Sequence, residues 1–158
     1  MNNSFTHFDQ AGNAIMVDIS EKREHDRIAV AEGSIIVNET IMNAIKNHTA
    51  KKGDVLGTAR IAGIMAVKHT PDLIPLCHTI SITNSSIDFQ IDEENQKVKA
   101  VCTVKTCDRT GVEMEALTGV TTSLLTIYDM CKAIDKRMEI TDIRLVYKDG
   151  GVSGEFIR

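Results

Sequence analysis

An acidic and a basic side chain lie close together near the end of a long helix that the sequence predicts over residues 112–135. Apolar residues on one face of this helix are expected to pack on a sheet: Leu117, Val120, Leu124, Ile127 and Cys131. Asp129 and Lys132 lie on the other side, three residues apart and within reach of each other. A solvated ion pair would explain them, yet the helix dipole disfavours an anion in the C-terminal half. The pair is therefore a candidate for acid–base chemistry.

A thiol and an imidazole stand next to each other at the end of an apolar, proline-stiffened segment. These are Cys77 and His78. Neighbours in an extended chain point to opposite faces, which argues against a Cys–His nucleophile pair. His78 is either an ordinary satisfied histidine or a cleft residue, and the sequence leaves both open. Glu113 and Glu115 suit the start of the long helix, where a structural role accounts for them equally well.

Basic residues scattered along the chain are candidates for holding phosphate. Lys52 comes just before Gly53 and a good helix N-cap, and Lys148 precedes a glycine-rich turn whose N–H groups suit an anion. An ordinary surface loop is the alternative for each. The chain has no P-loop and no dinucleotide-binding glycine motif, so phosphate would be held by dispersed side chains. The candidates are Arg27, Lys52, Lys132 and Lys148. The cysteine spacing predicts no metal site.

The periodicity predicts an α+β scaffold for these residues. Strands are expected over residues 27–37, 80–91, 97–107 and 139–147, and helices over 38–47, 54–68 and 112–135. The order β-α-α-β-β-α-β fits a ferredoxin-like antiparallel sheet with helices packed on one face. We expect residues 1–158 to form a single domain, with residues 1–20 as a loosely ordered N-terminal arm.

The helix expected over residues 54–68 is apolar on nearly every side. Small side chains form one stripe and larger ones cover much of the rest: Val55, Ala59, Ala62 and Ala66, then Ile61, Ile64, Met65 and Val67. A helix of this kind must be buried on several sides. In so small a domain this favours contact with another subunit as well as with its own sheet.

Composition narrows the class of protein. The 158 residues are 42% hydrophobic and carry a net charge of −4, with only four Phe, two Tyr and no Trp. These values argue against a partner that is nucleic acid or a membrane surface. We find no secretory signal and no segment long enough to span a membrane. Four cysteines without an export signal predict reduced thiols in the cytoplasm.

Six sequence runs together resemble one family, the cyclic pyranopterin monophosphate synthases of molybdenum cofactor biosynthesis (protein C family). They are MVDIS at 16–20, KGDV at 52–55, TARIAGI at 58–64, DLIPLCH at 72–78, TGVEMEALT at 110–118 and LTIYDMCKA at 125–133. The runs cover nearly the whole chain, and the last three are highly specific. One departure is Val152, where the family commonly carries a basic residue between Gly-Gly and Ser-Gly.

The resemblance implies a ferredoxin-like subunit in a homohexamer built as a trimer of dimers, with the active site at a subunit interface. It implies a phosphorus–oxygen lyase that converts (8S)-3′,8-cyclo-7,8-dihydroguanosine 5′-triphosphate to cyclic pyranopterin monophosphate and pyrophosphate. The implied catalytic residues are Asp129, Lys52 and Lys132. The implied substrate-binding residues are Leu76, Cys77, His78, Glu113, Met114, Glu115, Arg27 and Lys148. No cofactor or metal ligand is implied, and Mg²⁺ accompanying the triphosphate is left open.

Roles follow as hypotheses. Rebuilding a purine into a pterin needs repeated proton transfers, and a lysine among cationic neighbours has a lowered pKa suited to them. We expect this of Lys52 and Lys132, with Asp129 orienting Lys132 or taking a ribose hydroxyl proton. Arg27 and Lys148 would stabilise the departing pyrophosphate, and His78 and Glu115 would hydrogen-bond the heterocycle. The rival class is a non-catalytic ligand-sensing module; a hydrolase with a Cys77 nucleophile has little support.

Overall fold

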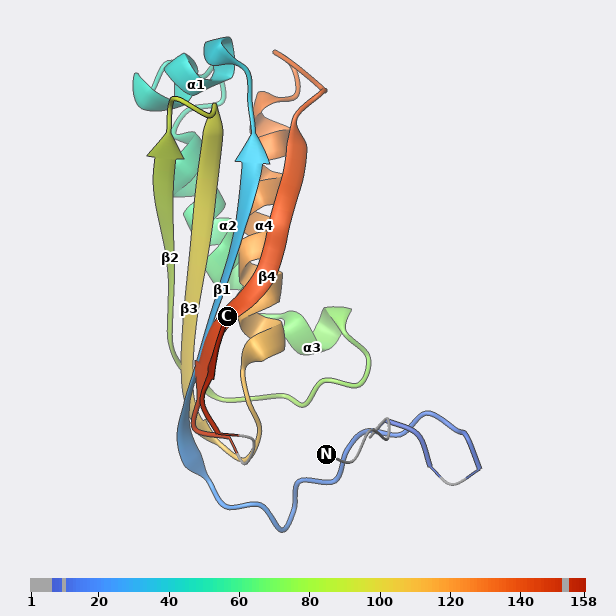
Figure 1. The fold of residues 1–158 in the computed structure, drawn as a ribbon. Helices are drawn as coiled ribbons and strands as arrows, with labels where there is room; N and C mark the ends of the chain where they lie inside the picture. Colours follow the sequence, from blue (N-terminus) through green and yellow to red (C-terminus); the bar gives the residue numbers. More distant parts are fainter. Residues whose placement is uncertain (1–6, 10, 152–153) are drawn as a thin grey trace.

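One antiparallel sheet forms the body of the protein, which we describe from a computed structural model covering residues 7–9, 11–151 and 154–158 (Figure 1). The five strands lie in the order β2-β3-β1-β4-β5. Their bounds are β1 His25–Ile36, β2 Ile82–Asp92, β3 Lys97–Asp108, β4 Glu139–Asp149 and β5 Phe156–Ile157. Side chains alternate along β1 and β3, so that Ala29, Ala31 and Val104 are fully buried on one face.

The described residues also form four helices: α1 Glu39–Lys46, α2 Val55–Lys68, α3 Thr70–Leu73 and α4 Glu113–Cys131. The Asn38 side chain accepts a hydrogen bond from the Ile41 N–H at 2.9 Å, and Asp54 accepts one from the Gly57 N–H at 2.9 Å. These caps satisfy N–H groups that a helix start otherwise leaves unpaired. Helices α2 and α4 lie side by side on one face of the sheet (Figure 1). None of the described helices is long and apolar enough to cross a membrane.

The prediction of a ferredoxin-like α+β sheet with helices on one face is confirmed. The order β4-β1-β3-β2 is the one that two split β-α-β units produce. Two short elements were not predicted. Thr70-Pro71 does not simply end α2 but opens the single turn α3, because proline is tolerated at a helix start. Strand β5 has only two residues, too few for a periodic signal.

Helix α4 ends four residues before the predicted position. Beyond Cys131 the chain turns, and the Asp135 carboxylate accepts hydrogen bonds from the Arg137 N–H at 2.9 Å and from the Asn38 side chain at 3.0 Å. The Tyr128 hydroxyl donates to the Lys136 carbonyl at 3.0 Å. These bonds hold a turn where the sequence predicted another turn of helix.

Within one chain the outer face of the helix layer is not buried. Ile61 and Met65 on α2 are 63% and 46% exposed, and Leu125 on α4 is 53% exposed. The residues of a single chain therefore do not by themselves give α2 the burial on several sides that the sequence predicted for this helix. Large side chains exposed on neighbouring helices are typical of a surface that contacts another protein.

Two glycines allow α2 and α4 to approach closely. A Cβ on Gly63 would overlap Ser123 Oγ and lie 2.9 Å from the carbonyl oxygen of Gly119. A Cβ on Gly119 would lie 2.8 Å from Val67 Cγ2 on α2 and 2.7 Å from Cys102 Sγ on β3. The Ser123 hydroxyl also donates to the Ala59 carbonyl at 3.1 Å, which ties the two helices together.

We expect Gly63→Ala to lower the free energy of unfolding by about 1–3 kcal/mol, because the added methyl group meets backbone as well as a side chain. The loss arises although alanine favours a helix by about 1 kcal/mol over glycine. Urea denaturation followed by circular dichroism measures it. Lys68→Ala, an exposed change on the same helix, is the control and should stay within about 0.5 kcal/mol. An unchanged midpoint for Gly63→Ala would show that the helices can separate at no cost.

Candidate active site

Three residues from the candidate list meet at the C-terminal end of α4. Lys132 Nζ lies 2.6 Å from Asp129 Oδ1, and Lys52 Nζ lies 3.3 Å from Asp129 Oδ2. Lys52 Nζ also donates to the Asp129 backbone carbonyl at 2.9 Å. Lys52 comes from the loop between α1 and α2, which reaches the same end of the molecule as the end of α4 (Figure 1). One carboxylate therefore accepts from two ammonium groups; we call these three residues the lysine cluster.

The charges in the lysine cluster reinforce one another. Hydrogen bonds from Lys132 and then Lys52 hold the pKa of Asp129 below its ordinary value. The hydrogen bond and charge of Asp129 in turn raise the pKa of Lys132. The prediction that cationic neighbours lower the pKa of this lysine is wrong for Lys132. The Asp129 carboxylate lies in direct contact with its ammonium group and stabilises the charged form.

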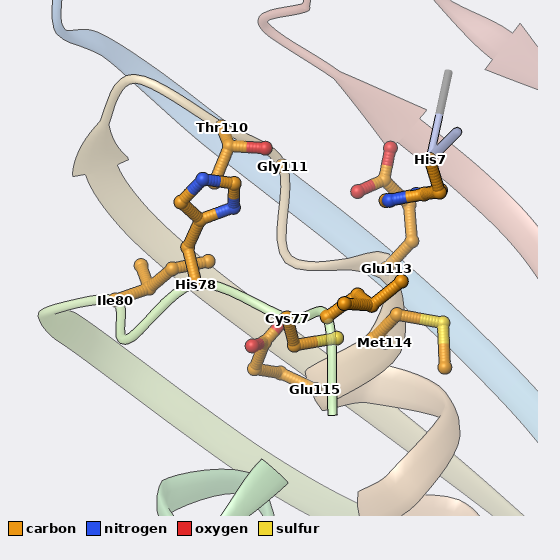
Figure 2. Close-up of a pocket in the computed structure, with 10 residues that line it drawn as sticks. His7, Cys77, His78, Ile80, Thr110, Gly111, Glu113, Met114 and Glu115 are labelled. Carbon is orange, nitrogen blue, oxygen red and sulfur yellow. The ribbon is translucent and has the colours of Figure 1, made fainter. Parts of the chain in front are cut away.

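A second group of candidates gathers at the N-terminal end of α4. A cavity of about 150 Å³ opens there between the segment before β2 and the first turn of α4 (Figure 2). Its lining residues are His7, Leu76, Cys77, His78, Ile80, Thr110, Gly111, Glu113, Met114 and Glu115. All six of the candidates from the segments 76–78 and 113–115 are thus brought together; we call this space the acidic cavity.

The two glutamates of the acidic cavity have different environments. Glu113 forms an ion pair with Lys148, with Nζ and Oε1 3.4 Å apart. Glu115, in contrast, is buried and only 3% exposed. Burial, with a further contribution from the charge of Glu113, raises the pKa of Glu115 to about 7. Carboxyl groups whose environments differ in this way are suited to different tasks in proton transfer.

Cys77 and His78 do not form a nucleophile pair. The His78 ring is hydrogen-bonded to the Val17 carbonyl, with Nε2 and O 2.8 Å apart. Burial, assisted by the charge of Glu115, raises the pKa of the Cys77 thiol. An activated cysteine nucleophile needs the opposite shift. The place of both residues in the cavity wall fits ligand contact instead.

Arg27 is buried and its guanidinium is already engaged. Nε donates to the Asp108 carbonyl at 2.8 Å and an Nη donates to the Arg109 carbonyl at 3.0 Å. These bonds hold the chain just before Thr110 and Gly111 in the cavity wall. The glycine-rich segment begins against the same strand, since a Cβ on Gly150 would lie 3.0 Å from Arg27 Cα. Val152, which departs from the family pattern, lies outside the described residues.

The lysine cluster and the acidic cavity lie far apart in one chain. Glu115 and Asp129 are fourteen positions apart, which corresponds to roughly 21 Å of helix axis at 1.5 Å per residue. Within the described part of the chain, no group of three or more His, Cys, Asp or Glu side chains is arranged to hold a metal ion.

The N-terminal segment contributes two groups that the sequence did not single out. His7 lines the acidic cavity, and the Val17 carbonyl binds His78. Val17 does lie in the run MVDIS, but a contact through a backbone carbonyl leaves no trace in side-chain type. The resemblance was therefore the one signal that pointed to this segment.

We expect Glu115→Gln to stabilise the protein at alkaline pH. A folded-state pKa of about 7 against 4.5 for the ordinary group means that the folded state holds the proton more tightly. The stability of the wild type should therefore fall as pH rises from about 4.5 to 7, and the glutamine variant should lack this fall. The difference should approach about 3 kcal/mol at pH 8 and vanish near pH 4.

Urea denaturation of both proteins at pH 4, 6 and 8 measures this difference. Glu94→Gln, at an exposed position in the hairpin between β2 and β3, is the matched control and should shift little at any pH. A difference between Glu115→Gln and wild type that does not change with pH would contradict the buried, easily protonated carboxyl.

Comparison with known proteins covers nearly the whole chain. A family model described as MoaC family matches residues 16–151. A protein of Clostridium botulinum (strain Alaska E43 / Type E3) named cyclic pyranopterin monophosphate synthase is 59% identical over 157 residues, covering 99% of each chain. Proteins with the same name from Clostridium perfringens (strain SM101 / Type A) and Dinoroseobacter shibae are 58% and 53% identical, covering 99% and 96% of each chain.

Proposed function

Because the chain belongs to the MoaC family, we propose that it catalyses the reaction for which its relatives are named. It converts (8S)-3′,8-cyclo-7,8-dihydroguanosine 5′-triphosphate into cyclic pyranopterin monophosphate, with release of pyrophosphate, in molybdenum cofactor biosynthesis. The observation that carries this function is the lysine cluster. Lys52 and Lys132, from two separate family motifs, both lie within 3.3 Å of the Asp129 carboxylate.

The substrate site is built from two copies of the chain in this proposal. A group that transfers a proton must lie within about 3 Å of the atom it serves. The lysine cluster and the acidic cavity are too far apart along α4 for both to act on one heterocycle. A second copy that presents its lysine cluster to this chain's acidic cavity completes the site. The exposed Ile61, Met65 and Leu125 support such contact, and a hexamer built as a trimer of dimers accommodates it.

The lysines transfer the protons needed to open the purine ring and close the pterin. Lys132 is held protonated by Asp129, so it begins as the proton donor. The low pKa of Asp129 makes it a poor proton acceptor, and its role is to orient both ammonium groups. Once a lysine has given up its proton, the neighbouring ammonium and Asp129 determine how readily it takes one back.

Cyclic phosphate closure follows. A hydroxyl oxygen of the substrate attacks the α-phosphorus, its proton goes to a deprotonated lysine, and the bond to the β-phosphate breaks. Lys148 lies at the edge of the acidic cavity and supplies positive charge to the leaving pyrophosphate. Arg27 acts indirectly, through the turn that it holds. The proposal needs no resident cofactor, and Mg²⁺ bound to the triphosphate is compatible with it.

The reaction takes place in the cytoplasm in this proposal. All four cysteines are free in the structure: Cys77, Cys102, Cys107 and Cys131. Free thiols, two of them buried in the core, are typical of a reducing compartment.

We expect Asp129→Asn to lower kcat by roughly 10²–10⁴-fold, because it removes the charge that orients both lysines. The assay supplies the cyclised dihydro-GTP and measures pyrophosphate together with the pterin after oxidation. Asp142→Asn is the matched control, since Asp142 also pairs with a lysine, Lys97, at 3.1 Å but lies elsewhere on the surface. Folded wild-type protein that releases neither product would refute the enzyme and favour a ligand-sensing module.

A shared site predicts that two inactive variants restore each other. His78→Ala disables the acidic cavity and Asp129→Asn disables the lysine cluster. In a random mixture half of the dimers are mixed, and each mixed dimer has one intact site, so activity should recover to about a quarter of wild type. Co-expression with two affinity tags, followed by the same assay, measures the recovery. If each chain held a complete site, the mixture would stay as inactive as its components.

A further inference from the structure

The N-terminal segment, residues 7–9 and 11–24, runs from the start of β1 along the end of the molecule that holds the acidic cavity (Figure 1). It has no helix or strand of the sheet, but hydrogen bonds fasten it at two points. The Val17 carbonyl is 2.8 Å from His78 Nε2, and Arg109 donates to the Ser20 carbonyl at 3.3 Å. His78 and the neighbours of Arg109, Thr110 and Gly111, all line the cavity. The segment is therefore attached to the walls of the cavity.

The bond to Val17 determines where His78 carries its proton. A carbonyl oxygen only accepts hydrogen bonds, so Nε2 must be the donor. A neutral imidazole carries one proton, and Nδ1 then has a free lone pair and can only accept. Among the described residues, no hydrogen bond to Nδ1 of His78 occurs.

We propose that the Val17 carbonyl is a positioning group that holds His78 as a hydrogen-bond acceptor at Nδ1, so that the cavity selects an N–H or O–H donor on its ligand. The inference rests on the proposed function only for the identity of that ligand. The tautomer of His78 is a property of the protein alone. The N-terminal segment is on this basis part of the binding site and not a loose extension.

The charges around the cavity agree with selection of a donor. Glu113 and Glu115 line the same cavity from α4. The Glu113 carboxylate and a neutral imidazole Nδ1 are both acceptors, so a ligand edge rich in N–H groups would satisfy more of them than an edge of carbonyl oxygens.

The first test observes the tautomer without any ligand. Full-length protein with ¹⁵N-labelled histidine is studied by long-range ¹H–¹⁵N correlation at pH 8. Loss of signals in His78→Gln assigns the residue, and His25→Gln serves as a control for an exposed histidine. We expect a single Nε2–H form for His78. An Nδ1–H form, or an equal mixture, would overturn the inference.

Two truncations assign the tautomer to Val17. Removing residues 1–6 should leave the His78 signals unchanged, whereas removing residues 1–17 should give a mixture of both tautomers. A single Nε2–H form that persists without Val17 would show that another group sets it. Circular dichroism checks that each truncated protein is folded.

The second test compares two substitutions, each of which retains a hydrogen-bonding group at the position of one imidazole nitrogen. The amide of His78→Asn places an acceptor where Nδ1 lies, and that of His78→Gln places a donor where Nε2 lies. If Nδ1 meets the ligand, KM for the cyclised dihydro-GTP should rise about tenfold or more further in Gln than in Asn, with a smaller change in kcat. Equal KM values, or a lower KM for Gln, would refute ligand contact at Nδ1. If the wild-type protein shows no turnover, the proposed function fails. The NMR experiment still tests the His78 tautomer, because it needs no substrate.

Discussion

The length of α4 is the constraint on which the arrangement of the candidate site depends. An unbroken helix fixes the distance between its ends, and α4 carries Glu113 and Glu115 in its first turn and Asp129 near its last. Its place on the sheet is fixed in turn by the close contact with α2 at Gly63 and Gly119. No side-chain rearrangement can bring the lysine cluster to the acidic cavity of the same chain. The separation is a property of the fold.

Local environment gives the three carboxyl groups along α4 different properties. Asp129 accepts from two ammonium groups and has a lowered pKa. Glu113 has one cation, Lys148, as its partner. Glu115 is buried near the negative charge of Glu113, and both effects raise its pKa, to about 7. The same functional group thus serves as a fixed negative charge at one end of the helix and as a group ready to exchange a proton at the other.

Local features of this chain could be predicted from the sequence, whereas features that depend on distant contacts could not. The helix starts at Asn38 and Asp54 followed from cap residues, and the Asp129–Lys132 pair followed from helical spacing. Spacing gives no reason for Lys52 to join them, because it comes from a loop 77 residues away, and only the family resemblance placed it there.

The errors have the same origin. The pKa of Lys132 was assigned the wrong direction because its positive neighbours were considered without the carboxylate between them. The end of α4 was placed too late because Asp135 takes its partners from Asn38 and Arg137, which helical periodicity does not reveal.

Symmetry explains how a second copy can remedy the separation. A two-fold axis perpendicular to two neighbouring helices makes them antiparallel, so in the proposed dimer the C-terminal end of each α4 would lie beside the N-terminal end of the other. Helix dipoles in that arrangement attract, and one contact would cover the exposed Ile61, Met65 and Leu125 of both copies. The lysine cluster of the partner subunit would then lie near Glu115. Two ammonium groups beside a carboxyl with a pKa of about 7 favour its charged form. Assembly would therefore lower the pKa of Glu115 again, and the residue whose burial costs stability in one chain would be able to take a proton from a substrate held between two.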